Sequence, residues 1–223
     1  YCQDLSNWTS GHTAQVVRPF KRFLVALDKT ESGTRYPFRV HWSHPAEGGT
    51  VPVTWDSSDD TKDAGYVDLS QTNGWVKDCL PLKDTNIIYK EDSVWAMDYS
   101  GGQSIFSFRQ IFNDAGILGR ECAKSFEGGH FVVGLDDVYT HDGQSRQSIV
   151  DTQIRDELFK ILEVAKPDNG KYLIKLIEYL LPEFRDVIDL DGGHHHNESV
   201  DKHMLNAFFI MKINNDTLVS YSM

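Results

Sequence analysis

Residues 86–98 read NIIYKEDSVWAMD, and residues 130–142 read HFVVGLDDVYTHD. Aligned without gaps, the two stretches match at an offset of 44 residues, so that Asp92 falls on Asp136. Each copy has an apolar run, a tight acidic turn and an aromatic run, which is the pattern of two antiparallel strands joined as a hairpin. The pair is therefore an internal repeat of one strand–turn–strand unit.

The repeat predicts the architecture of this part of the chain. Upstream of the two copies, Cys79 and Cys122 lie 43 residues apart, so the similarity extends beyond the hairpin itself. A period of roughly 40 to 50 residues with four short strands per unit is typical of a β-propeller blade. Two similar hairpins in a β-sandwich are the alternative. We expect a mainly β fold of propeller-like antiparallel sheets, incomplete as a ring.

Strand and turn composition extends over residues 1–150. All five tryptophans and 14 of the 17 glycines lie before residue 150. Glycine-containing turn clusters separate short apolar and aromatic runs, as expected for antiparallel strands. The expected strands include Phe23–Leu27, Phe38–Trp42, Asn86–Tyr89, Val94–Met97, Ile105–Phe108 and Phe131–Val133. We assign residues 1–150 to one β region.

The hydrophobic period changes to that of helices after Val150. Apolar stripes at helical spacing occupy residues 154–165 and 173–181, and Pro182 ends the second of them. A third predicted helix begins at Ser199, a residue type that caps helix N-termini. We assign residues 151–223 to a small α-helical segment.

Composition and charge exclude several classes of protein. The 223 residues are 40% hydrophobic and 12% aromatic, which excludes a disordered chain. The net charge of −11 argues against a surface that grips phosphate backbones or anionic lipid. No apolar run is long enough to span a membrane, so we expect a soluble protein. The start Tyr1-Cys2-Gln3 shows no signal peptide and suggests a processed end, and three cysteines argue against a disulfide framework.

The β region resembles a known family through short motifs in a fixed order. They are VRPFKRFLVAL at residues 17–27, VHWS at 40–43, PVTWD at 52–56, IIYKEDS at 87–93 and HFVVGLDDVY at 130–139. In this order they resemble tail nozzle or tail tubular proteins of short-tailed bacteriophages, over about residues 8–150. The resemblance implies a virion structural protein, not an enzyme, that self-associates into a ring, contacts the head-to-tail connector and other tail proteins, and forms part of the DNA exit conduit. It would be assembled in the host cytoplasm and located in the virion tail.

The helical segment is similar to a different family. The stretches RDELFKIL at residues 155–162, YLLPEF at 179–184 and HHNESVDKHML at 195–205 resemble the region before the HD domain of CCA-adding tRNA nucleotidyltransferases. The match covers about residues 153–213. The nucleotidyl-transfer core has no counterpart, and no His-Asp pair follows His203. The alternative function is therefore an RNA nucleotidyltransferase or HD-type phosphohydrolase accessory domain, although the segment holds 8 basic and 13 acidic residues.

One histidine cluster offers metal-ligand chemistry. His194, His195, His196 and His203 lie within ten positions, and neutral imidazole is a common ligand of transition metals. His196 and His203, with Asp191 or Glu198, are the candidate metal ligands. A glycine- and histidine-rich loop is also an ordinary polar connector, and we expect no cofactor.

The remaining chemical groups favour structural roles. Asp136, Asp137 and Asp142 could offer oxygens to calcium, but their spacing matches no EF-hand, and turn roles are expected. Ser43 lies near His41 and His44 without the frame of a nucleophile elbow. We expect no catalytic residues. A carbohydrate-binding β domain is a third possibility, which requires exposed tryptophans and calcium at the acidic turns.

The acidic balance has a further interpretation for a conduit. Negative walls repel phosphate, so DNA would pass through without specific binding. This hypothesis requires that acidic side chains line the passage.

Overall fold

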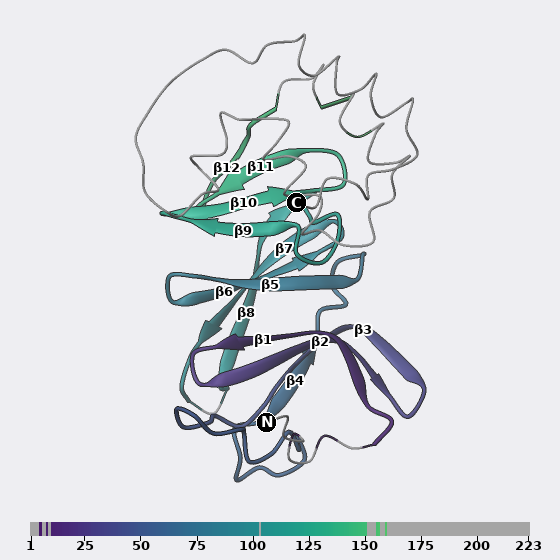
Figure 1. Ribbon diagram of the computed structural model, residues 1–223, viewed down its shortest axis with the longest axis vertical. Helices are drawn as coiled ribbons and strands as arrows, with labels where there is room; N and C mark the ends of the chain where they lie inside the picture. Colours follow the sequence, from purple (N-terminus) through teal and green to yellow (C-terminus); the bar gives the residue numbers. More distant parts are fainter. Residues whose placement is uncertain are drawn as a thin grey trace, which may run out of the picture.

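The computed structural model describes residues 10–102 and 104–150, together with Leu5, Trp8, Arg155, Asp156 and Phe159 (Figure 1). In these residues the fold consists of three antiparallel sheets of four strands. The first sheet contains β1 (Thr13–Phe20), β2 (Phe23–Glu31), β3 (Thr34–Trp42) and β4 (Gly65–Asp68). The second contains β5 (Val76–Leu82), β6 (Thr85–Lys90), β7 (Ser93–Tyr99) and β8 (Phe106–Asn113). The third contains β9 (Ala123–Phe126), β10 (Gly129–Val133), β11 (Val138–His141) and β12 (Arg146–Ser148).

Every sheet is a meander in which each strand pairs with its neighbours in the chain. In Figure 1 the first sheet lies at the bottom, the second in the middle and the third at the top. Tight turns with positive φ join several strands, for example at Gly33 between β2 and β3 and at Gly128 between β9 and β10. Glycine adopts this conformation without a steric penalty, which suits it to the turns. The sheets therefore follow one another in space as they do in sequence.

The internal repeat corresponds to equivalent hairpins in two successive sheets. Ile88 on β6 lies opposite Trp95 on β7, and their repeat partners Val132 and Tyr139 lie opposite each other on β10 and β11. The next pairs in the ladder also match, because Tyr89 faces Val94 and Val133 faces Val138. The predicted strand–turn–strand unit is confirmed in both copies, with the same register.

The core has two parts, one on each side of the second sheet. Ile88, Trp95 and Met97 pack in a cluster with residues of the first sheet such as Val25 and Val40. Ile87, Tyr89 and Val94 pack in another cluster with residues of the third sheet. Because side chains alternate across a strand, neighbouring residues of β6 enter different clusters. Each fully buried aliphatic side chain of this kind contributes roughly 1.5–3 kcal/mol, so both joints rest mainly on apolar burial.

The outer face of the first sheet is covered by a long connection, residues 43–64. Trp55 in this connection is 2% exposed, and its carbonyl oxygen lies 2.9 Å from Nε2 of His41 on β3. His44 N donates to Thr54 O at 3.0 Å, which closes the connection on itself. The connection thus covers the outer face of the first sheet around His41.

The connection from the second to the third sheet, residues 114–122, runs through the joint between them. Ile117 is fully buried and donates its N–H to Lys90 O, and Leu118 donates to Val133 O, both at 2.9 Å. A Cβ at Gly116 would lie 2.0 Å from the carbonyl oxygen of Glu91. Only glycine fits where this backbone crosses the turn between β6 and β7.

The mainly β, antiparallel fold is confirmed for the part of the chain that the structure describes. The propeller arrangement stays a prediction, since three successive sheets are also compatible with other stacked arrangements. The predicted helices and almost all of the predicted 151–223 segment lie outside the described residues. Phe159, one of three described residues there, packs against the cluster shared by the second and third sheets.

Candidate functional site: the joints between the sheets

A buried carboxylate joins the first two sheets to the connection that leads into the third. Asp78 on β5 is 2% exposed and receives two hydrogen bonds from Arg18 on β1, at 3.0 Å from Nε and 2.9 Å from Nη2. Its Oδ2 also accepts the backbone N–H of Glu121 at 2.8 Å, just before β9, and its Oδ1 accepts that of Cys79 at 2.9 Å. A buried carboxylate is stable only when its oxygens are fully partnered, and here each oxygen has two donors.

The first strands of the three sheets lie close together at this joint. β1 contacts β5, and β5 contacts β9. Arg120, in the connection before β9, donates from Nη1 to the carbonyl oxygen of Gln15 on β1 at 3.0 Å, which links the first sheet to that connection. β5, which holds Asp78, thus contacts the first strand of each of the other two sheets.

The surface of these first strands is not acidic. β1 and β9 contain no carboxylate, and Asp78, the one carboxylate of β5, is buried. Arg18, Lys77 and Lys124 are the charged residues of these strands that reach the surface, at least in part. The acidic lining expected from net charge is therefore not supplied by β1, β5 or β9. The acidic residues gather instead in turns and in the 43–64 connection.

A second polar group is buried between the second and third sheets. Tyr89 Oη on β6 lies 2.7 Å from Nδ1 of His130 on β10 and 2.6 Å from Nε2 of His141 on β11. His130 Nε2 lies 3.0 Å from Pro81 O, and Gly143 N–H points to His141 Nδ1 at 3.2 Å. All three side chains are at most 3% exposed.

The partners fix the direction of every hydrogen bond in this group. A carbonyl oxygen only accepts, so His130 Nε2 donates to Pro81 and Nδ1 accepts from the Tyr89 hydroxyl. A backbone N–H only donates, so His141 Nδ1 accepts from Gly143 and Nε2 donates to Tyr89. The result is a continuous chain of neutral groups. Burial lowers the pKa of His130, and burial followed by the neighbouring His130 lowers the pKa of His141 to about 3.

The outer face of the first sheet holds a third polar cluster. Lys29 on β2 is 4% exposed and donates to Nδ1 of His41 at 3.0 Å and to Glu31 at 2.9 Å, with its ammonium 5.0 Å from the ring centre of Trp8. His41 in turn donates from Nε2 to Trp55 O. Burial, and then the Lys29 charge, lowers the pKa of His41 to about 4, so its imidazole is neutral at pH 7.

Arg39 lies beside this cluster and is held between two rings. Its guanidinium carbon is 3.9 Å from the ring centre of Tyr36 and 4.0 Å from that of Tyr66. Two hydrogen bonds, at 2.8 and 2.9 Å, join it to Asp68 on β4, which pairs with β3 at this position. Stacking and bidentate pairing together immobilise Arg39 against the sheet.

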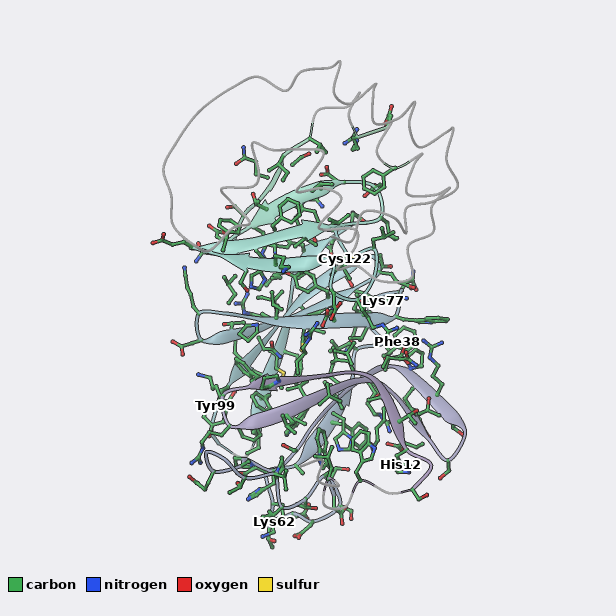
Figure 2. All side chains as sticks on the ribbon, viewed as in Figure 1. His12, Phe38, Lys62, Lys77, Tyr99 and Cys122 are labelled. Atoms are coloured by element: carbon green, nitrogen blue, oxygen red, sulfur yellow. The ribbon has the colours of Figure 1, made fainter. Side chains whose placement is uncertain are left out.

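Lys90 is buried without a carboxylate partner among the ion pairs of the described residues. Its ammonium donates to Leu69 O at 2.7 Å, Thr72 O at 2.6 Å and Thr72 Oγ1 at 2.7 Å, and lies 5.0 Å from the Phe38 ring centre. Burial lowers its pKa. Figure 2 labels Phe38 at the level where the first and second sheets meet. The three hydrogen bonds of the Lys90 ammonium fix the connection from β4 to β5, because Leu69 and Thr72 both lie in that connection.

The candidate nucleophiles of the sequence have structural roles. Ser43 is fully buried, donates to His44 O at 2.8 Å and accepts Leu24 N–H at 3.0 Å, so no histidine nitrogen activates it. Burial raises the pKa of the Cys79 and Cys122 thiols to about 12, which keeps both protonated and unreactive. Cys122 lies near the joint between the second and third sheets (Figure 2).

The acidic turns bind their own backbone. Asp142 Oδ1 accepts the N–H groups of Gln144 and Ser145 at 2.9 and 2.8 Å, which lowers its pKa to about 2. Asp137 accepts the Ser148 hydroxyl at 2.7 Å. No group of three or more His, Cys, Asp or Glu residues suited to a metal ion occurs within the described ranges. The expected turn roles are confirmed for these two aspartates.

The tryptophans mostly belong to the core. Trp42 and Trp95 pack between the first and second sheets, and Trp55, within the 43–64 connection, is buried against the first sheet. Trp75 is 41% exposed, with the Arg35 guanidinium carbon 4.0 Å and the Lys77 nitrogen 5.2 Å from the ring centre. This arrangement does not present the row of bare rings that the carbohydrate-binding alternative requires.

The candidate metal ligands His196 and His203 lie outside the described residues, as does most of the stretch similar to CCA-adding enzymes. Sequence reasoning missed Asp78, Arg18, His130, His141 and Tyr89 as a functional set. His130 could have been found as the single polar side chain of an otherwise apolar strand, whereas the strands of the other four contain further polar residues. No helix among the described residues is long and apolar enough to cross a membrane. The chain matches no protein-family model and no curated protein sequence.

Proposed function

We propose that the chain is a structural tail protein of a short-tailed bacteriophage, a nozzle or tubular component that forms part of the DNA exit conduit. The observation that carries the proposal is that β5 contacts the first strands of the other two sheets, with Asp78 bonded to Arg18 on β1 and to Glu121 just before β9. Propeller blades meet along their innermost strands in this way. The fold class and the ordered motifs of residues 8–150 agree with it.

The buried ionisable groups also favour a structural role. Asp78, Lys90, His41 and the Tyr89 network are each satisfied by protein partners, and each links one sheet or connection to another. An enzyme site holds ionisable groups that face a substrate, whereas these groups face one another. The polar residues of the joints serve rigidity.

Assembly follows from the free edges of the sheets. The last strands are little buried: all three residues of β12 are exposed, and β4 has no buried residue. Within the described residues no further strand pairs with β4, β8 or β12. Unpaired N–H and C=O groups at such edges favour pairing with another chain. We propose that copies of the chain associate into a ring that contacts the head-to-tail connector and other tail proteins in the virion, after assembly in the host cytoplasm.

DNA would pass such a ring without specific binding. The described first strands present isolated cations and apolar residues, such as Val17, which is 44% exposed, and no ordered set of base-reading groups. Passage depends on a surface that offers no repeated, spaced phosphate contacts.

The test combines solution mass and imaging. Light scattering coupled to size-exclusion chromatography should show a defined oligomer, and electron micrographs of the same fraction should show rings. Antibodies against residues 10–150 should label the tail of intact particles of the encoding phage. A monodisperse monomer at high concentration, together with particles that carry no label, would contradict the proposal.

A further inference from the structure

The polar group between the second and third sheets has a counterpart at the other joint that differs in chemistry. His130 lies opposite His141 in the third sheet, and the equivalent cross-strand pair in the second sheet is Asn86 and Met97. Asn86 Nδ2 lies 3.7 Å from Met97 Sδ, and neither side chain titrates. Of the two equivalent positions, the one at the second joint alone holds groups whose ordinary pKa, about 6.5, lies in the mildly acidic range.

Every hydrogen-bonding position in the histidine pair is already occupied. A proton added to His141 at Nδ1 would meet the Gly143 N–H, and one added to His130 at Nδ1 would meet the Tyr89 O–H. Both cases place two hydrogens against each other, and the group is too buried for water to take over. Protonation therefore breaks the chain of hydrogen bonds at the position where it occurs.

No nearby charge compensates for this proton. Asp142 is the carboxylate that raises the pKa of His141, but burial lowers that pKa by more. The Oδ1 atom of Asp142 is also occupied by the N–H groups of Gln144 and Ser145. After burial, Tyr139 and Asp78 are the groups that raise the pKa of the Tyr89 hydroxyl. Asp78 is already paired with Arg18. The centre of the Phe112 ring lies 5.4 Å from that of His141, and this apolar neighbour offers no charge to balance the proton.

We propose that the network of Tyr89, His130 and His141 is a pH-sensitive joint that holds the third sheet on the second at neutral pH and loosens it in mild acid. The hydrogen bond from Glu121 N to Asp78 and the one from Tyr139 Oη to Gly116 O do not depend on histidine. They keep the loosened sheet tethered. The opening equilibrium of the third sheet should rise about tenfold for each pH unit below about 6.5 for one histidine, and more steeply for two.

The proposal is tested by hydrogen exchange of the full chain over about pH 7 to 4.5, corrected for the intrinsic exchange rate of each amide. Amides of β9–β11 should lose protection as the pH falls, while those of β5 and the first sheet change less. The pKa of His41 is also lowered, but His41 lies on the outer face of the first sheet, so local opening caused by its protonation is expected in β2, β3 and the 43–64 connection. Equal loss in all three sheets would overturn the proposal.

A matched variant uses the chain's own alternative pair. The triple variant Tyr89→Phe, His130→Asn and His141→Met places an Asn–Met pair, like that of Asn86 and Met97, at the second joint. It also removes the Tyr89 hydroxyl, which would have no partner once both histidines are replaced. Its third sheet should show no acid-dependent loss of protection, whereas His12→Gln, a histidine outside both buried clusters, should behave as the wild type. If the triple variant does not fold, nuclear magnetic resonance titration of the wild-type imidazoles decides. Ring signals of His130 and His141 that titrate at the ordinary histidine value would overturn the proposal.

Discussion

The guanidinium of Arg18 on β1 meets the carboxylate of Asp78 on β5 through two hydrogen bonds, and 43 residues further along the chain the N–H of Glu121 meets the same carboxylate. One buried side chain thus links the first sheet, the second sheet and the connection that leads into the third. Replacing Asp78 should therefore lower the free energy of unfolding of the whole chain, although the residue lies on a single strand.

Asp78→Ala should lower the free energy of unfolding by about 3 kcal/mol, because it leaves the Arg18 guanidinium and two backbone N–H groups without an acceptor. Asp78→Asn should cost less, since its Oδ1 can still accept. Urea unfolding followed by tryptophan fluorescence measures both. The control is Asp84→Ala, which removes the partner of Lys21 in an ion pair whose carboxylate is 99% exposed. This change should leave stability nearly unaltered, and an equal loss in both variants would contradict the role of Asp78.

His41 should make the chain less stable in acid. Its pKa in the folded state, about 4, is below the ordinary value of 6.5, so the unfolded chain binds the proton first. The stabilisation is complete above pH 6.5 and is lost as the pH falls toward 4, by about 3 kcal/mol for this residue.

Unfolding free energies measured across this pH range should show a smaller acid loss in His41→Gln than in the wild type. His12→Gln is the matched control and should retain the full loss. If His41→Gln and the wild type lose stability in parallel, His41 does not stay neutral in the fold.

Gly116→Ala should destabilise the chain by at least about 2 kcal/mol, because the new Cβ would lie 2.0 Å from the Glu91 carbonyl oxygen, and backbone must move to relieve the contact. Gly48→Ala is the comparison, since a Cβ there has no neighbour within 4 Å. Thermal unfolding should show a lower Tm for the first variant and an unchanged one for the second. Equal Tm values would mean that residues 114–122 do not pass through the joint as described.

Cys79 and Cys122 should resist alkylation in the folded protein. Their thiols are buried, and with a pKa of about 12 they form almost no thiolate under mildly alkaline conditions. In a Cys2→Ser background, a thiol reagent should react with neither residue until denaturing urea is added, after which both should react. Rapid labelling of Cys122 without denaturant would show that the second joint opens at neutral pH.

The sequence was sufficient to predict the strands and their pairing where a local rule applies. The hairpins of residues 86–98 and 130–142 follow from their apolar runs and acidic turns, and both form, with equivalent cross-strand pairs. It was not sufficient for the joints. Arg18 and Asp78 are 60 residues apart, and nothing local tells which polar residue of a strand will find a partner in another sheet.

The outer face of the first sheet shows the same limit. Residues 56–63 have the composition of a solvated acidic loop, and Asp56 and Asp59 do cap turns there through the N–H groups of Ser58 and Thr61. The neighbouring Trp55 is nevertheless drawn over the sheet by His41, a contact that depends on the folded position of β3. Net charge likewise does not tell whether a passage would be acidic, because a sum over residues carries no information about which surface each one occupies.

Since each strand pairs only with its immediate neighbours in the chain, a sheet is complete as soon as its fourth strand has been synthesised. A nascent chain can therefore close the first sheet at Asp68 while the rest is still inside the ribosome. The carboxylate of Asp78 can then pair with Arg18 as soon as β5 has formed. It accepts the N–H of Glu121 only later, when that residue has been synthesised. Translation order and spatial order coincide, so the growing polypeptide needs no long-range search to add each layer.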